Sequence, residues 1–447
     1  MPSPEADIQA VFKPHVPSSI ADSFPSTAIS SGHEWSDTDK PKILIVGAGI
    51  GGLLLGNLLR KAGCQFLIIE KAKELKPLGS CMAAGSGVSN LFRQLGILDE
   101  FKAIGKPHMG LEVYSNDRQR FFLLDSSEHP QYCGATEQIV ARPDLHDLLL
   151  RQVPRENIHM SKKVIAFEQN DEGVTIHCSD DSIYHGDILV GADGAHSAVR
   201  EHLFQVLLDK GMLPSVDDGD LPFDCVCLVG QTEVLDPEDF PEMKLPNSKF
   251  NSILADDYVW VTATTLRNTI CWMAVQHLDA ETSKRVDPSS SSSWGPEAAE
   301  AMCNEVRHLQ IPSGAGALTA MHDAVALANW ISTLQKPKLA DVEAVFAEYQ
   351  TERLPAVQEA AATTRLFKRM GGQGIVATLS RSFFHYMPRF IFKQLLVKMT
   401  ESRPQVSFLP LVEDTGCYPP KHQPSLAKTL VIHTEQAAEE QIETLSF

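Results

Sequence analysis

Basic residues are scarce in this sequence. The chain has 39 Lys and Arg against 57 Asp and Glu, which gives a formal net charge of −18. A protein with this charge repels polyanions and offers no basic surface to a phosphate backbone. The composition therefore argues against DNA or RNA as a partner.

Long apolar runs are also lacking. No stretch of about 18 or more apolar residues could span a bilayer, and residues 1–40 contain no secretory hydrophobic segment. The nine cysteines are scattered without a CxxC pair, which is typical of reduced thiols. We expect a cytoplasmic protein.

Signatures of metal and serine hydrolase chemistry are missing too. The 16 histidines form no HExxH motif, and no G-x-S-x-G nucleophile elbow occurs. His322 stands beside Asp323, but the apolar period around it indicates helix packing. We therefore expect no metal.

The chain does have enough apolar sequence for a large core. Its 447 residues are 43% hydrophobic and 21% charged, which suits two intertwined domains. Residues 1–40 are rich in Pro, Ser and acids, and are expected to form a disordered or loosely attached extension. Their removal should leave thermal stability unchanged.

A glycine motif follows this extension. From Lys42 the text KILIVGAGIGGLLLGNLLRKAGCQFLIIEK predicts a strand, a glycine turn, a helix and a second strand that ends at Glu70. Gly47, Gly49 and Gly52 form G-x-G-x-x-G, in which missing Cβ atoms let backbone N–H groups approach a pyrophosphate. Glu70 stands where a carboxylate accepts hydrogen bonds from an adenosine ribose. The unit predicts dinucleotide binding but does not separate NAD from FAD.

A second turn provides that distinction. GADGAHSAVR, residues 191–200, follows a predicted strand and opens a helix. It resembles the DG motif of class A flavoprotein monooxygenases, the para-hydroxybenzoate hydroxylase-like family. The resemblance implies that Asp193 and Gly194 lie near the flavin and NAD(P)H pyrophosphates, with Arg200 in the following helix. Read alone, an Asp-Gly pair after a strand is an ordinary turn.

Further resemblances spread over the chain. VARPDLHDLLL is similar to the family's arginine-led helix, which implies that Arg142 contacts the flavin pyrophosphate; a guanidinium suits a phosphate in geometry. The residues alone also allow a solvated arginine at a helix start. Gly79, Ala84 and Gly85 match the loop that passes the flavin edge in such enzymes.

GALTAMHDAVALANWI resembles the stretch after the third flavin motif, especially in fungal members of secondary metabolism. The match implies that Gly316 and Ala317 begin a helix whose positive end faces the flavin pyrimidine, with Gly314 in the loop before it.

One part of the family pattern is missing. No G-D-x-x-H occurs between residue 201 and Pro312, and the loop from Pro312 to Gly316 is one residue short. Residues before this loop look helical rather than like a strand. The sequence therefore predicts a seam near residues 310–315, weak FAD binding and impaired activity, unless another segment such as residues 251–276 supplies the wall.

The predicted fold is α/β. Residues 41–210 and 311–375 should form a Rossmann-like FAD-binding domain, interleaved with a mostly antiparallel substrate sheet from residues 108–140 and 211–310. Residues 376–447 are expected to form a C-terminal helical region and tail. Within it, residues 380–399 mix aromatic with basic residues, which suits either peripheral membrane contact or a helix packed on the flavin domain.

The resemblance implies an FAD-dependent monooxygenase that uses NAD(P)H and O₂ to hydroxylate or epoxidise an apolar organic substrate. The alternative is an inactive relative or truncated isoform that acts as a binding protein. An ordinary NAD dehydrogenase is disfavoured by the DG motif. The sequence leaves open the substrate, the choice of nicotinamide cofactor and the oligomeric state.

Overall fold

The computed structural model describes residues 29–30, 35–36, 39–75, 79–194, 197–213, 225–254, 258–277, 316–335, 338–371, 379, 382–431 and 434. Its strands are β1 Ile29–Ser30, β2 Lys42–Val46, β3 Gln65–Ile69, β4 Cys81–Ala84, β5 Gly105–Pro107, β6 Gly110–Ser115, β7 Arg120–Asp125, β8 Gln138–Ala141, β9 Ile158–His159, β10 Val164–Asn170, β11 Gly173–Cys178, β12 Ser182–Gly186, β13 Ile188–Gly191, β14 Cys225–Gln231, β15 Phe250–Leu254, β16 Tyr258–Thr264 and β17 Ile270–His277. Its helices are α1 Ile50–Lys61, α2 Ser86–Leu95, α3 Leu98–Ile104, α4 His129–Cys133, α5 Arg142–Leu150, α6 Ala198–Asp209, α9 Gly316–Ser332, α10 Leu339–Gly371 and α12 Arg389–Thr400, with short 3-10 helices η2 Arg155–Asn157 and η3 Pro241–Lys244.

A four-stranded parallel sheet, in the order β13-β2-β3-β9, carries the glycine motif. Its two middle strands are apolar almost throughout because both faces of the sheet are covered. Ile43 and Ile68 belong to a core shared with α1 and α9. Leu44 and Leu67 face the other way and pack with residues of β10, β11 and β12, such as Ile176.

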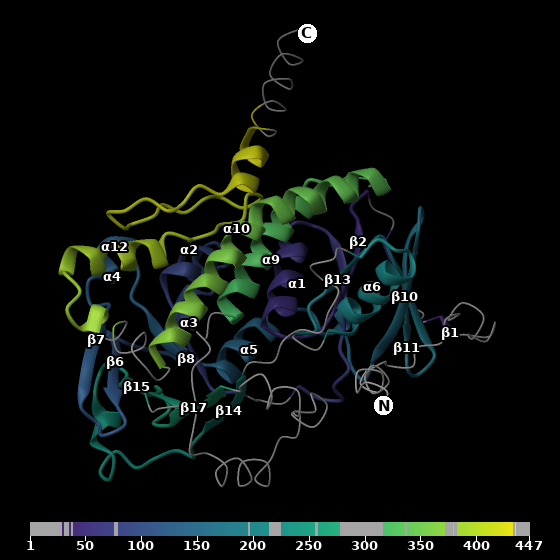
Figure 1. Ribbon diagram of the computed structural model, residues 1–447. Coiled ribbons are helices and arrows are strands. Elements are labelled where there is room, and N and C mark those ends of the chain that lie inside the picture. Colours follow the sequence, from purple (N-terminus) through teal and green to yellow (C-terminus); the bar gives the residue numbers. More distant parts are fainter. Residues whose placement is uncertain are drawn as a thin grey trace, which may run out of the picture.

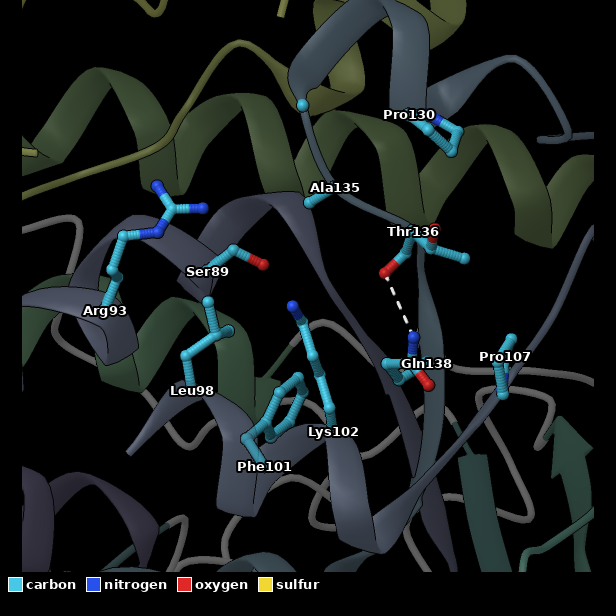
Figure 2. Close-up of a pocket in the computed structure, with 11 residues that line it drawn as sticks. Ser89, Arg93, Leu98, Phe101, Lys102, Pro107, Pro130, Ala135, Thr136 and Gln138 are labelled. Carbon is cyan, nitrogen blue, oxygen red and sulfur yellow. Dashed lines mark hydrogen bonds between the residues drawn. The ribbon is translucent and has the colours of Figure 1, made fainter. Parts of the chain in front are cut away.

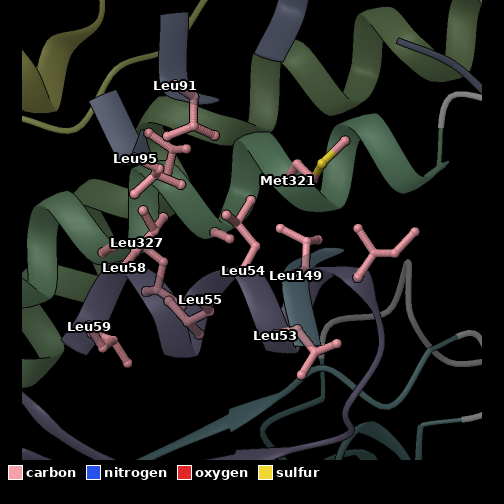
Figure 3. Packing of buried hydrophobic residues seen from close by; sticks show 14 of the residues in the cluster. Leu53, Leu54, Leu55, Leu58, Leu59, Leu91, Leu95, Leu149, Met321 and Leu327 are labelled. Carbon is pink, nitrogen blue, oxygen red and sulfur yellow. The ribbon is translucent and has the colours of Figure 1, made fainter. Parts of the chain in front are cut away.

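Helices α1 and α9 pack against each other although about 270 residues separate them. Leu54 and Leu58 of α1 and Met321 and Leu327 of α9 share one buried cluster, which Figure 3 shows from close by. A Cβ atom on Gly51 would lie 3.3 Å from the Cβ of Ala320, so the glycine allows the two helices to approach closely. This packing fixes the start of α9 beside the start of α1.

A six-stranded sheet, in the order β14-β17-β16-β15-β6-β7, forms a second layer. All of its pairs are antiparallel except β15 with β6. Figure 1 shows β6, β7, β14, β15 and β17 at one end of the molecule and β10 and β11 at the other, with α1, α5 and α9 between them. The predicted α/β fold with a mostly antiparallel second sheet is confirmed.

A small sheet, β4-β8-β5, connects the part of the chain that carries the glycine motif to the six-stranded sheet. Strand β8 leads directly into α5, and the backbone N–H of Ser248 donates to the Pro107 carbonyl at the end of β5. Segments from both predicted domains therefore meet here. The domain boundaries themselves remain a prediction.

Other segments add local detail. Residues 85–105 form the two helices α2 and α3, because Gly96 adopts φ +75° after α2 and the chain restarts at α3. Residues 110–125 form the hairpin β6–β7. The meander β10-β11-β12 was not predicted, although its alternating burial suits half-buried strands.

The chain before residue 41 is not all loosely attached. Strand β1 pairs in parallel with β12, and Lys40 donates to the Ser332 carbonyl at 2.9 Å. Trp35 packs against the cluster of Leu44 and Ile176, and its indole N–H donates to the His185 carbonyl at 2.8 Å. The expectation of a loose extension is therefore wrong for these described residues.

Among the described helices, none is both long and apolar enough to cross a membrane.

We expect Trp35→Ala to lower the free energy of unfolding by about 1–2 kcal/mol, because a half-buried indole loses its apolar contacts and its hydrogen bond. Urea denaturation followed by circular dichroism measures the change. Val234→Ala is a matched control at a side chain that is 71% exposed, and it should change little. Equal stabilities of the Trp35 variant and the unmodified protein would show that the indole contact contributes nothing.

Candidate functional site

At two of the three glycines in the turn between β2 and α1, neighbouring backbone atoms leave no room for a Cβ atom. Gly47 has φ +107°, and a Cβ there would lie 2.5 Å from the Ala192 carbonyl oxygen. A Cβ on Gly52 would lie 2.1 Å from the Gly47 carbonyl oxygen. These two positions need glycine for the turn itself, with or without a ligand.

Gly49 differs from its two neighbours. The nearest atom to a Cβ on Gly49 would be the Ala192 oxygen at 4.0 Å, so the fold leaves room there. Gly49 is the N-cap of α1, and no side chain caps this helix. The uncapped N–H groups and the positive end of the helix suit a pyrophosphate that approaches over Gly49.

Glu70 follows β3 beside this turn. Its Oε2 accepts the N–H of Ala48 at 2.7 Å, and its Oε1 accepts the N–H of Ala72 at 2.8 Å. Two backbone donors thus hold the carboxylate in place, and each oxygen keeps a further acceptor site for a ribose hydroxyl. His146 on α5 donates to the Ala48 carbonyl at 2.8 Å and anchors the turn from the other side.

The Asp-Gly turn after β13 meets the glycine turn. Asp193 Oδ2 accepts the N–H of Ala198 at 2.8 Å and so caps α6, while Gly194 adopts φ +86°. Asp193 Oδ1 is buried and has no hydrogen-bond partner among the described residues. Oδ2 of Asp193 therefore stabilises the start of α6, whereas Oδ1 still needs a hydrogen-bond donor. Arg200 lies in the first turn of α6, as the sequence predicted.

Arg142 begins α5. Its N–H donates to the Ser80 carbonyl at 2.8 Å, and its side chain is exposed. Gly79 has φ +120°, and a Cβ there would lie 2.8 Å from Arg142 Cδ, so the glycine gives the arginine side chain its room. Two residues further on, in the first turn of α5, Asp144 pairs with Arg267 of the β16–β17 turn at 2.7 Å, which ties this helix start to the six-stranded sheet.

Ala84 and Gly85 end β4 and precede α2. Ala84 is buried, and a Cβ on Gly85 would lie 2.7 Å from Glu137 Cα, so Gly85 permits a close approach of Glu137. From the sequence, the small side chains of Ala84 and Gly85 were assigned to the flavin edge, and the contact between Gly85 and Glu137 was missed. Glu137 carries no sequence signal that could have identified it.

The start of α9 lies next to the start of α2. A Cβ on Gly87 would lie 3.1 Å from Leu318, and His322 donates to the Gly87 carbonyl at 2.9 Å. Gly316, exposed, and Ala317, half-buried, begin this helix. Gly314 and Pro312, together with the predicted seam at 310–315, lie outside the described residues.

These features fit a dinucleotide. The structure brings the turns of Gly47 and Asp193 into contact, leaves Gly49 open, and presents one unpartnered carboxylate oxygen. The same edge of the parallel sheet carries Glu70. The described part of the chain has no group of three or more His, Cys, Asp or Glu placed to hold a metal.

A pocket of about 380 Å³ lies beside α2, lined by its residues Ser89 and Arg93 (Figure 2). Leu98, Phe101 and Pro107 give it apolar walls, and the Lys102 ammonium and the Arg93 guanidinium supply positive charge. It shares none of its lining residues with the glycine turn or the Asp-Gly turn.

A parallel sheet with an open glycine turn and a second turn at its edge defines a dinucleotide-binding α/β protein. Residues 40–210 match the family described as FAD binding domain. The chain is 33% identical over 201 residues to 6-hydroxynicotinate 3-monooxygenase of Bordetella bronchiseptica, which covers 42% of this chain and 52%, about half, of that enzyme. It is 24% identical over 430 residues to an FAD-dependent monooxygenase of Apiospora sacchari, covering 83% of this chain and 87% of that one.

Solved structures agree in fold. Klebsiella pneumoniae HpxO complexed with FAD and uric acid superposes with a TM-score of 0.61 at 18% identity, covering 81% of this chain and 97% of HpxO. A salicylate hydroxylase complex gives 0.56 at 16% identity, covering 81% and 98%. Residues 40–210 thus match an FAD-binding domain, and most of the chain is similar to FAD-dependent monooxygenases.

We expect Gly49→Val to fold and to lose affinity for ADP by about tenfold or more, because branched carbons occupy the open space over the turn. Isothermal titration with ADP measures the loss. Gly52→Ala is the matched comparison: its Cβ would clash with Gly47, so it should lower the free energy of unfolding by about 1–3 kcal/mol or more. An unchanged ADP affinity in folded Gly49→Val would refute the assignment.

A second prediction concerns His322, which is 8% exposed on α9. Burial lowers the pKa of His322 to about 4, so the folded protein holds the imidazole neutral. The unfolded chain binds a proton near pH 6.5, so stability is lost as the pH falls from about 6.5 toward 4. Between pH 7 and pH 5 this residue should cost about 2 kcal/mol.

The measurement is urea denaturation at pH 7 and pH 5. His322→Gln can still donate to the Gly87 carbonyl but does not titrate, so its loss of stability between these pH values should be smaller than that of the unmodified chain. Identical losses in the two proteins would contradict the pKa shift.

Proposed function

We propose that this chain uses NAD(P)H and O₂ to hydroxylate or epoxidise an apolar organic substrate, with FAD as its bound cofactor. The observation that supports it most is the contact between the turns of Gly47 and Asp193 at one edge of the parallel sheet. One turn alone would suit many nucleotide proteins. Both together match the FAD-binding fold of the family.

Specific residues would hold FAD. Gly49 and the N-terminus of α1 suit the pyrophosphate, Glu70 suits the adenosine ribose, and Arg142 adds a guanidinium to the phosphate side. Asp193 has one buried oxygen without a hydrogen-bond partner in the described part of the chain, which would accept from a cofactor hydroxyl or a bridging water. When bound, FAD supplies the redox chemistry that activates O₂.

The ring end of the cofactor would lie near Ala84, Gly85, Gly316 and Ala317. The positive end of α9 favours negative charge at that place. The start of α9 and the Ala84–Gly85 turn are held together through Gly87 and Leu318, so both sides of this end form one unit. The protein's task is to orient the substrate and to exclude water.

The six-stranded sheet supports an apolar substrate. Val113, Phe122, Val259 and Val261 form a buried apolar cluster on it together with Phe384. Residues 251–276, which hold β16 and most of β15 and β17, are the part of the chain that would stand in for a missing wall.

The cellular location proposed is the cytoplasm, with peripheral membrane contact through residues 380–399. Phe384 packs on Phe122 with ring centroids 5.7 Å apart, which accords with a helix docked on the protein. Phe383, Tyr386 and Phe390 are 55%, 78% and 65% exposed, which accords with a surface contact. One observation thus supports a helix packed on the protein, and the other supports contact with a membrane surface.

The competing proposal is an inactive relative that keeps the fold and binds flavin poorly. It rests on the absence of G-D-x-x-H before residue 312. Losing one charge-assisted contact to the cofactor costs about 1.5–3 kcal/mol, or roughly ten- to a hundredfold in affinity.

We predict that the purified chain binds FAD weakly, and that insertion of a family-like strand with G-D-x-x-H before Gly314 raises the affinity by roughly ten- to a hundredfold. FAD fluorescence quenching measures the affinity, and the absorbance of bound flavin near about 450 nm gives the stoichiometry. Glu70→Ala should weaken binding in both versions, since the ribose acceptor is lost.

The outcomes separate the two proposals. Stoichiometric FAD in the unmodified chain with rapid reduction by NAD(P)H would show that nothing is impaired. Failure of both versions to bind FAD would favour the inactive relative over the monooxygenase.

A further inference from the structure

A buried polar cluster lies directly behind the Ala84–Ser86 turn. It consists of Ser86, His108, His129 and Glu137, which come from α2, the β5–β6 connection, α4 and the segment before β8. Glu137 exposes 14% of its side chain, and the two histidines expose 6% and 7%. None of these residues was a candidate from the sequence.

Glu137 holds the first turn of α2. The backbone N–H and the hydroxyl of Ser86 both donate to Glu137 Oε1, at 3.0 and 2.9 Å. The Gly85 N-cap has no side chain to satisfy the helix start, so a carboxylate 51 residues away in sequence replaces the usual cap. The position of the Ala84–Ser86 turn therefore depends on one distant side chain.

The carboxylate is ionised. Burial raises the pKa of Glu137, but the His129 imidazole and the two donors of Ser86 outweigh this and leave the pKa below its usual range. In the described part of the chain, the titratable groups that sense this charge are His108, His129 and Cys133. A buried anion needs such partners to be tolerated.

The two histidines lie near the carboxylate without a closed hydrogen bond to it. His129 Nδ1 lies 3.7 Å from Glu137 Oε1, and the ring nitrogens of His108 and His129 have no hydrogen-bond partner among the described residues. Burial lowers the pKa of His108, so this ring stays neutral.

We propose that Glu137 is a positioning residue for the flavin site: its carboxylate fixes the Ala84–Ser86 turn, and its charge acts on the electrostatics of the flavin ring end. This inference rests on the proposed function, since the turn is assigned to the flavin edge by resemblance. A fixed negative charge near the ring opposes the extra negative charge of reduced flavin. Neutralising Glu137 should therefore make the reduction potential more positive.

The first test uses the full chain without FAD. Glu137→Ala should speed amide hydrogen exchange at residues 86–89 by about tenfold or more, because the start of α2 loses its acceptor. Glu137→Gln keeps an acceptor oxygen and should preserve most of the protection. Glu172→Gln, at an exposed carboxylate in the β10–β11 turn, is the control and should change nothing. Unchanged exchange in Glu137→Ala would overturn the positioning role, whether or not FAD binds.

The second test uses FAD-loaded protein. Glu137→Ala should weaken FAD affinity by about tenfold, and Glu137→Gln by far less. The reduction potential of bound FAD should become more positive in Glu137→Gln, a shift that a purely structural role would not produce. Equal potentials in Glu137→Gln and in the control Glu172→Gln would overturn the electrostatic part.

Failure of the proposed function gives a different result. If the unmodified chain binds no FAD while Glu137→Ala still loosens the turn, the flavin role of Glu137 is overturned together with the proposed function, although Glu137 would remain the cap of α2. If the unmodified chain binds FAD and the Glu137 variants match it, this inference alone fails.

Discussion

The close approach of two chain turns is the constraint on which the candidate site depends. Strands β2 and β13 are parallel neighbours with Val46 opposite Gly191, so both strands end at the same level. The Ala192 N–H donates to the Val46 carbonyl at 2.8 Å, and the space left beside Gly47 is too small for any Cβ. This contact aims α1 and α6 at one place, where their N-termini can serve one ligand.

The C-terminal segment supports both α2 and α9. Asn329 of α9 is fully buried and bonds to the Gln405 carbonyl at 3.1 Å and the Ser407 N–H at 2.8 Å. Gln94 of α2 bonds to Val406 from the opposite side, at 3.0 and 2.8 Å. Residues 405–407 therefore hold α2 and α9 at a fixed position relative to each other. This keeps the Ala84–Ser86 turn and the start of α9 together.

Much of the fold could be predicted because it follows local patterns. Continuous apolar runs predicted β2 and β3, and the 3.6-residue period of the stretch that begins at Leu318 predicted α9. The sequence pattern does not mark the break between α2 and α3, because the break depends on a left-handed Gly96. The attachment of Trp35 was missed because its partners lie about 150 residues away on β12.

The sequence by itself determined the nucleotide-binding motifs, since the spacing of Gly47, Gly49, Gly52 and Glu70 is a local requirement of one strand–turn–helix unit. Only the tertiary structure decided which glycine serves the fold and which leaves room for a ligand, because the answer depends on Ala192, far along the chain. The tertiary structure also shows that Gly85 leaves room for the close approach of Glu137. Such contacts arise from packing between distant segments, and no sequence period records them.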